Sequence, residues 1–219
     1  MTKAEAGPVT RTRNPRGQGG RLREQLVEAA AHLLATVDQP ESLTLRRVAR
    51  EVGVAPASVY GHFADFGALF NHVLALRYRE LDEMLRSASD GPDAPARLMG
   101  LCVAYVDWGV RHPGEYRTLF GGRIPAGVTM TAHEPGIALL ELLTAALSEA
   151  LDHDGDASSE ERRRAGLLLW TALHGLVSAR AEHPGIPWPD WRDQGSDIVA
   201  MQTEHAHRRT LRLTAGSAP

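Results

Sequence analysis

The sequence predicts an all-α fold of about nine helices, with three N-terminal helices followed by a larger helical domain. Apolar residues recur at helical spacing in most segments, Gly-, Pro- and Asp-rich stretches separate these segments, and no stretch alternates as a strand would. A chain of 219 residues can bury a core and fits one large or two small domains. We expect a disordered basic arm over residues 1–20, a helix-turn-helix domain over 21–66 and a helical domain over 67–219.

The first twenty residues are mostly Gly, Pro, Thr and Arg and offer almost nothing to bury, so we expect them to be disordered in the free protein. The first helix should begin near Arg21 and end at Asp38-Gln39-Pro40. Its apolar residues fall on one face, as in an amphipathic helix. They are Leu22, Leu26, Ala29, Ala30, Leu33, Leu34 and Val37.

Residues 44–63, TLRRVAREVGVAPASVYGHF, have the form of a helix-turn-helix. Thr44 can cap the first of the two helices, and Gly53 stands where the chain must turn sharply. Pro56 suits the first turn of the second helix, because its missing N–H has no helical partner there. The second helix of such a motif lies in the major groove of DNA. An ordinary helical hairpin is the alternative, but it would not require a basic arm in front of it.

The remaining helices follow from the same periodicity. Asp65 can cap a long helix over 66–87, and the loop 89–93 marks the start of the larger domain. A helix over 94–111 should stop at His112-Pro113-Gly114 and be followed by a short helix over 115–120. We expect a long loop over 121–136 and a second loop over 183–189. The other helices are expected over 137–151, 159–181 and 191–213.

The charge is unevenly distributed along a chain whose net charge is −3. Residues 1–23 contain six basic residues and one acidic residue, whereas residues 67–219 contain fifteen basic and twenty acidic residues. A basic end on an acidic body indicates a nucleic-acid reader with a separate partner domain.

Several classes of site are disfavoured. Cys102 is the only cysteine, which excludes an intrachain disulfide, and its apolar surroundings predict a buried, inert thiol. His205 and His207 form the tightest pair among ten histidines, but residues two apart do not share a helix face. We therefore expect no metal, no cofactor and no enzymatic activity. The absence of an apolar run long enough for a membrane span, and of a signal core, favours a cytoplasmic protein.

The segment GVAPASVYGHFADFGALF, residues 53–70, resembles the tetracycline-repressor (TetR/AcrR) family of ligand-responsive transcription factors. The resemblance implies that the second helix contacts double-stranded DNA. Two positions depart from the family pattern: Ala55 replaces the usual Ser or Thr cap, and Phe66 replaces a usual lysine. Arginines of the arm can offset these lost phosphate contacts. The candidate DNA-binding residues are Arg11, Arg13, Arg16, Thr44, Arg46, Arg47, Ala55, Ala57, Ser58, Tyr60 and His62.

Two later segments also resemble this family: YVDWGVRHPGEYRTLF at 105–120, and the pattern Trp170-x-x-x-His174-Gly175. They imply a helical domain that binds a small-molecule effector and dimerises. Trp170 and His174 share a helix face, and His174 either hydrogen-bonds the effector or is a satisfied core histidine. The candidate ligand-binding residues are Met99, Cys102, Val103, Val106, Phe120, Leu139, Leu143, Trp170, Leu173 and His174.

The last two long helices carry more apolar surface than one helix pair needs. In the family such helices pair across a two-fold axis, and a homodimer suits a palindromic operator. The candidate dimer-interface residues are Leu169, Leu173, Leu176, Arg180, Ile198, Met201 and His205.

The sequence thus favours a dimeric repressor that a small, largely apolar molecule releases from a palindromic operator. Two alternatives stay open. One is a helical enzyme or small-molecule carrier with an incidental helix-turn-helix, and the other is a DNA binder without ligand control.

Overall fold

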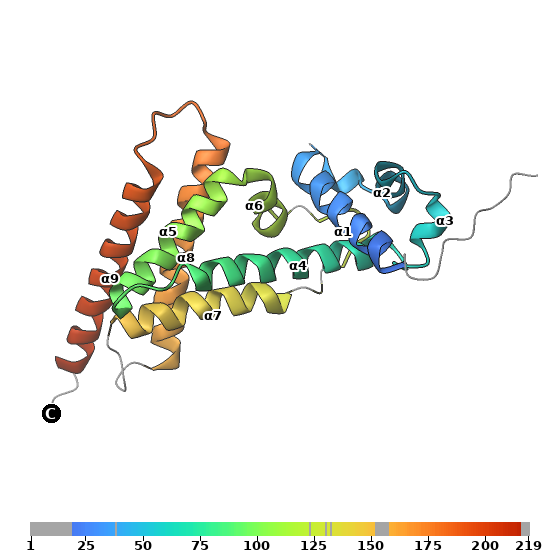
Figure 1. The fold of residues 1–219 in the computed structure, drawn as a ribbon. Coiled ribbons are helices and arrows are strands. Elements are labelled where there is room, and N and C mark those ends of the chain that lie inside the picture. The colour runs from blue at the N-terminus through green and yellow to red at the C-terminus, as the bar shows by residue number, and fades with distance from the viewer. Residues whose placement is uncertain are drawn as a thin grey trace, which may run out of the picture.

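A long helix, α4 (Phe66–Ser87), runs from the N-terminal unit into the larger helical domain (Figure 1). The computed structural model describes residues 19–37, 39–122, 124–129, 131, 133–151 and 158–215. Over this part of the chain it contains nine α-helices and one 3-10 turn. Because α4 packs on α1 and also on α5, α6 and α7, it belongs to the cores of both halves.

The N-terminal unit consists of α1 (Gly19–Thr36), the 3-10 turn η1 (Pro40–Ser42), α2 (Leu45–Val52) and α3 (Pro56–Val59). Each boundary has a local cause. The Thr44 hydroxyl accepts from the Arg47 amide at 3.4 Å and caps α2, and Asp65 accepts from the Ala68 amide at 2.7 Å and caps α4. Gly53 ends α2 in the left-handed region at φ 75°, where glycine has no Cβ penalty.

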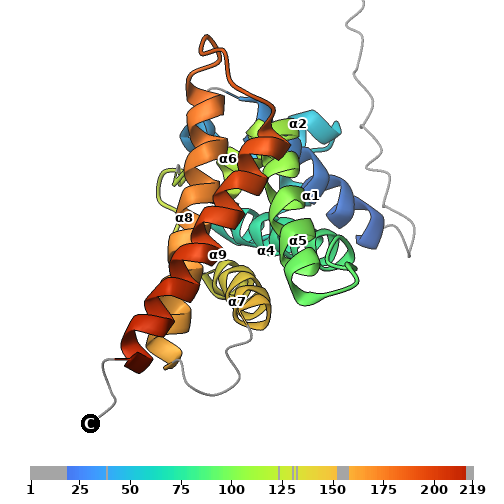
Figure 2. The ribbon, with the colours of Figure 1, turned by 90° about the vertical axis from the view of Figure 1, so that its left-hand side faces the viewer.

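The larger domain is built around α5 (Ala94–Arg111), which packs on α7 (His133–Ala150), α8 (Ser159–Glu182) and α9 (Trp191–Ala215). Figure 2 shows α8 and α9 side by side on the face away from the N-terminal unit. Helix α8 begins with a complete capping box, in which the Ser158 hydroxyl and the Glu161 carboxylate bond each other's backbone amides.

Helix α6 (Pro113–Phe120) lies between the two halves and packs directly on α1. A Cβ added to Gly114 would lie 2.1 Å from the carbonyl oxygen of Ala35, so only glycine permits this backbone approach. Arg117 strengthens the contact, because its Nη2 donates to the same carbonyl at 3.3 Å.

The expected all-α architecture and most helix boundaries are confirmed, with several differences. Helix α1 begins at Gly19, so residues 19 and 20 of the expected disordered arm are helical. Helix α6 begins at Pro113 instead of residue 115, because proline is accommodated at the first helical position. Helix α7 begins at His133, which shortens the expected loop 121–136, and α9 continues to Ala215. The turn η1 was not expected from the sequence.

Replacing Gly114 with alanine should destabilise the fold by about 1–3 kcal/mol, because backbone atoms of α1 would have to move away from the new methyl group. This loss opposes the roughly 1 kcal/mol that alanine gains over glycine inside a helix. Urea unfolding followed by circular dichroism measures the difference. Gly20→Ala is the matched control, because Gly20 also lies in the first turn of a helix and a Cβ there meets nothing within 4 Å. Equal stability of the two variants would contradict the close α1–α6 contact.

Candidate nucleic-acid interface and regulatory core

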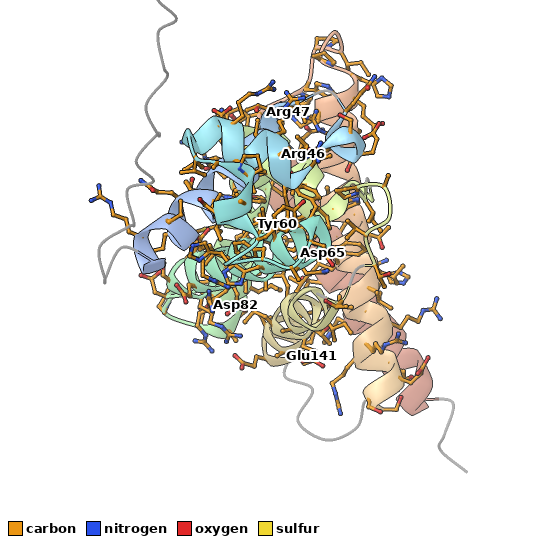
Figure 3. The ribbon with its side chains drawn as sticks, turned by 90° about the vertical axis from the view of Figure 1, so that its right-hand side faces the viewer. Arg46, Arg47, Tyr60, Asp65, Asp82 and Glu141 are labelled. Atoms are coloured by element: carbon orange, nitrogen blue, oxygen red, sulfur yellow. The ribbon has the colours of Figure 1, made fainter. Side chains whose placement is uncertain are left out.

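Helix α2 exposes one polar face and buries the other. Leu45, Val48 and Ala49 are buried, whereas Thr44, Arg46 and Arg47 are exposed. Figure 3 shows that Arg46, Arg47 and Tyr60 lie at the same end of the molecule, on the N-terminal unit. The arm arginines Arg11, Arg13 and Arg16 lie outside the described residues, so their role stays a prediction.

The second helix of the motif, α3, has only four residues, and Tyr60, Gly61 and His62 form a turn after it instead of continuing the helix. Val59 anchors this segment in the core with no exposed surface, whereas Tyr60 is 55% exposed. His62 is half-buried, and its amide donates to the Val59 carbonyl at 2.9 Å. The other candidate residues of this segment, Ala55, Ala57 and Ser58, are exposed.

The two departures from the family pattern have visible consequences. Ala55 occupies the cap position of α3 and makes no side-chain cap hydrogen bond. Phe66 is half-buried and packs against the core. The surface around α3 therefore offers few donors for phosphate, and the exposed cations of this unit come from α1 and α2.

An aromatic cluster occupies the larger domain between α4, α5, α6 and α8. Its rings form stacked, tilted and edge-to-face pairs, with centroids between 4.8 and 6.2 Å apart, which are favourable aromatic geometries. Trp170 stacks on His174 at 5.0 Å, and Tyr116 stacks on the same imidazole at 5.5 Å. The members are Tyr78, Tyr105, Trp108, Tyr116, Phe120, Trp170 and His174.

A chain of hydrogen bonds runs through this cluster. The Tyr105 and Tyr116 hydroxyls are 2.9 Å apart, the Tyr116 hydroxyl lies 2.6 Å from Nδ1 of His174, and Nε2 of His174 lies 3.4 Å from the Ser178 hydroxyl. The chain can run in either direction, and in both cases each link has one donor and one acceptor. Tyr78 is satisfied separately, because its hydroxyl donates to the Leu119 carbonyl at 2.7 Å.

Burial keeps the titratable members of this cluster neutral. It lowers the pKa of His174 below 6.5 and raises the pKa of Tyr78 to about 12, because both charged forms lose solvation. Desolvation also raises the pKa values of Tyr105 and Tyr116. Both nitrogens of His174 have partners within the chain, which fits a satisfied core histidine. A ligand that reached it would have to exchange one of these bonds.

The candidate ligand-binding residues do not line a single cavity. Cys102, Val106, Leu139, Leu143 and Leu173 are buried in the core. As expected, Cys102 is a buried free thiol, and burial raises its pKa to about 12.

The half-buried ligand candidates lie in three separate places. Phe120, Trp170 and His174 belong to the aromatic cluster, and Val103 lies elsewhere on α5. Met99 borders an open groove of about 560 Å³ between α5, α7 and α9.

Three of the dimer candidates were predicted wrongly. Leu169 is fully buried, Leu173 nearly so, and Leu176 is 8% exposed, because this side of α8 packs against the chain's own core. Ile198 is half-buried, whereas Met201 and His205 are exposed on α9.

Arg180 is half-buried and is engaged within the chain, and its place in a dimer contact stays a prediction. Its Nη1 donates to the Pro189 carbonyl at 2.9 Å and to Gln194 at 2.5 Å, and its guanidinium lies over the rings of Trp188 and Trp191. It holds the start of α9 against the end of α8.

The sequence reasoning missed the two tyrosines of the hydrogen-bond chain. Tyr105 stands within an apolar stretch, and Tyr116 shares a helix face with Leu119 and Phe120. A buried tyrosine hydroxyl needs a partner, so their positions already indicated a polar network. Within the described part of the chain, no group of three or more His, Cys, Asp or Glu side chains could hold a metal ion. No described helix is long and apolar enough to cross a membrane.

Comparison with known families gives two matches. Residues 98–214 match the family described as "Tetracyclin repressor-like, C-terminal domain", and residues 26–73 match "Bacterial regulatory proteins, tetR family".

Curated relatives match over part of the chain. An uncharacterized HTH-type transcriptional regulator of Haemophilus influenzae is 34% identical over 86 residues, which cover 39% of this chain and 42% of the relative. The nucleoid occlusion factor SlmA of Escherichia coli is 28% identical over 100 residues, or 45% of this chain and 50% of SlmA. The chain therefore spans half or less of the length of these relatives.

Solved structures match over most of the chain. A protein of unknown function from a Rhodococcus species has a TM-score of 0.66 and 26% identity, covering 85% of this chain and 94% of that one. A transcriptional regulator from Pseudomonas aeruginosa, described as putative, has a TM-score of 0.70 and 19% identity, covering 89% and 96%. The similarity to the Pseudomonas structure is evidence for the fold alone.

Tyr60 is a large exposed side chain of the candidate interface, so replacing it tests whether this surface binds DNA. Tyr60→Ala should weaken specific DNA binding by roughly 1–3 kcal/mol without unfolding the chain, because Val59 and not Tyr60 anchors this segment. Tyr60→Phe separates the hydroxyl from the ring. Fluorescence anisotropy with a labelled operator measures affinity, and circular dichroism checks folding. Unchanged affinity of a folded alanine variant would remove Tyr60 from the interface.

Proposed function

The chain belongs to the tetR family of bacterial regulatory proteins, whose members are DNA-binding transcriptional regulators, and we propose that it is a dimeric repressor. A small, largely apolar molecule would release it from a palindromic operator. The observation that carries the proposal is that the short helix α6 both packs on α1 of the helix-turn-helix unit and contributes Tyr116 to the aromatic core.

The DNA-binding part of the proposal rests on the exposed face of α2 and α3. Arg46 and Arg47 supply positive charge for phosphate, and Tyr60 with the small residues of α3 can approach base edges. One short helix reads few base pairs. Two copies related by a two-fold axis would read half-sites about 34 Å apart, one turn of DNA.

The outer face of α8 and α9 supports a dimer. Leu168 is 39% exposed and Met201 is 60% exposed, although both are large apolar side chains. Gly175 is exposed in the middle of α8, and a Cβ there would meet nothing within 4 Å. The single chain gives no packing reason for this glycine, which costs about 1 kcal/mol relative to alanine in a helix. The close approach of a second copy would supply such a packing reason. The proposed contact thus uses Leu168, Gly175, Ile198, Met201 and His205.

The aromatic cluster supports control by a ligand. Tyr116 of α6 bonds His174 of α8, while Gly114 and Arg117 of the same helix contact Ala35 of α1. A molecule that inserts beside His174 would displace Tyr116 and move α6, and α1 would move with it. The cluster offers mostly ring faces and few polar groups, so the effector would be largely apolar.

A DNA binder without ligand control is a second candidate. The similarity to the nucleoid occlusion factor SlmA and the internally satisfied bonds of His174 favour it. Regulators of this family are generally not enzymes, so the enzyme alternative has no comparable support.

Gel shift with the DNA immediately upstream of the chain's own gene tests the proposal. Retention of that fragment over shuffled DNA of equal length, with release by apolar compounds, supports a ligand-controlled repressor. Specific retention that none of these compounds changes favours the second candidate. Equal weak retention of both fragments contradicts a specific operator in that region. Fluorescence of Trp170 reports binding at the cluster independently, and Trp170→Phe is the control.

The proposed two-fold contact yields a prediction for Gly175. Gly175→Arg should place an unpaired charge between two copies and weaken association by roughly 3–5 kcal/mol. Gly175 is exposed and a Cβ there meets nothing within 4 Å in the single chain, so the variant should stay folded. Multi-angle light scattering should change from dimer to monomer, and operator affinity should fall with it. Ala181→Arg, exposed on another face of α8, is the control. A Gly175→Arg variant that stays dimeric would place the contact elsewhere.

A further inference from the structure

Arg23, Phe63 and His72 meet where α1, the turn after α3 and α4 come together. The Arg23 guanidinium carbon lies 4.9 Å from the centre of the Phe63 ring, and its Nη1 lies 3.0 Å from Nε2 of His72. The rings of Phe63 and His72 are 6.0 Å apart. Phe63 is buried, and Arg23 and His72 are half-buried, so the cluster is only partly screened by solvent.

The chemistry of this contact fixes the state of His72. An arginine guanidinium has only donors, so one ring nitrogen of His72 must be the acceptor and carry no proton; Nε2 lies 3.0 Å from Nη1 of Arg23, and Nδ1 lies 3.4 Å from Nη2. The imidazole is therefore neutral while the bond exists. A planar guanidinium group also stacks favourably on the face of an aromatic ring. The same Arg23 side chain is therefore stabilised by its contact with Phe63 as well.

The position of the cluster links it to DNA binding. Arg23 lies in the first turns of α1, next to the residues that lead to the basic arm. Phe63 is joined to the recognition segment, because its amide donates to the Val59 carbonyl at 3.0 Å. The cluster thus connects the start of α1, the end of the turn after α3 and the first part of α4.

We propose that Arg23 is a positioning residue for operator binding. It acts through His72 and Phe63 to hold the recognition turn, residues 60–62 after α3, in a fixed position against the start of α1 and the first part of α4, and not by contacting phosphate. In the alternative, Arg23 leaves the cluster to bind DNA, and His72 would then lose its hydrogen-bond donor. The proposal requires only that the chain binds DNA, and it is independent of the effector and of the dimer contact.

Acid should open this cluster. Burial lowers the pKa of His72 below 6.5, and the charges of Arg23 on α1 and Arg79 on α4 lower it further. Among the described carboxylates near these elements, Glu28 is paired with Arg77 at 2.7 Å and Asp65 accepts from the Ala68 amide. Phe63 contributes no charge. The bonded arrangement is therefore fully present above pH 6.5 and is lost as the pH falls toward the lowered pKa.

A double-mutant cycle tests the positioning role. The probe is an operator fragment selected from random double-stranded DNA by the full-length chain. Arg23→Met and His72→Leu should each weaken binding about tenfold, as expected when a bond to a charged donor is lost. The double variant should be weaker than either single variant by no more than about threefold, because both changes remove one interaction.

Arg21 provides the matched control, because it is an exposed arginine on the same helix. Arg21→Met and His72→Leu should combine additively, since Arg21 is not part of the cluster. Additive effects of Arg23→Met and His72→Leu would overturn the proposal and make Arg23 a direct DNA contact. Circular dichroism checks that each variant is folded.

The pH dependence gives a second readout that does not depend on a disruptive variant. Operator affinity should fall between pH 7.5 and about pH 5.5, in a His62→Gln background that removes the histidine of the recognition turn. A histidine in direct contact with DNA would gain charge and bind more tightly in acid, which is the opposite sign. His72→Gln keeps a neutral acceptor for Arg23, so it should retain affinity at pH 7.5 and lose the acid weakening. Acid weakening that persists in His72→Gln would overturn the role of His72.

Discussion

The backbone contact between Gly114 of α6 and Ala35 of α1 is the constraint on which the relation between the two halves depends. Helix α4 connects the halves covalently and packs in the cores of both. The α1–α6 contact fixes the halves at a second place, where the two backbones meet without an intervening side chain. The chain after α6 adds further ties, since Asn71 of α4 donates to the Thr129 carbonyl at 2.9 Å and accepts from the Thr131 amide at 2.8 Å.

The other side of α6 faces a core that is aromatic but not purely apolar. Tyr105, Tyr116 and His174 are buried or half-buried, and each finds its partners among the others or Ser178. A satisfied network of this kind specifies one arrangement, and losing one partner leaves a buried group with a cost of about 1–3 kcal/mol. The same property makes the network sensitive to any molecule that competes for His174, so the proposed regulation would use the bonds that stabilise the fold.

The sequence was sufficient to predict those helix boundaries that depend on one residue type. Thr44, Gly53 and Asp65 act where the sequence predicts, because a cap or a left-handed turn needs only local chemistry. It was insufficient for the partners of α8, whose apolar residues occur on more than one side. Periodicity identifies apolar faces but not whether a face meets the same chain or another copy, which is why Leu169 and Leu173 were misassigned.

The two faces of α8 explain why the effector and the dimer contact would be coupled. His174 and Gly175 are neighbours in sequence, yet His174 turns inward between Trp170 and Tyr116 while Gly175 lies exposed on the outer side. A rigid helix cannot rotate one face without the other. A shift of α8 caused by a ligand at His174 would therefore move the proposed two-fold contact and, through Tyr116 and α6, the recognition turn. One helix can thereby change both the orientation of each DNA-reading unit and the separation between the two.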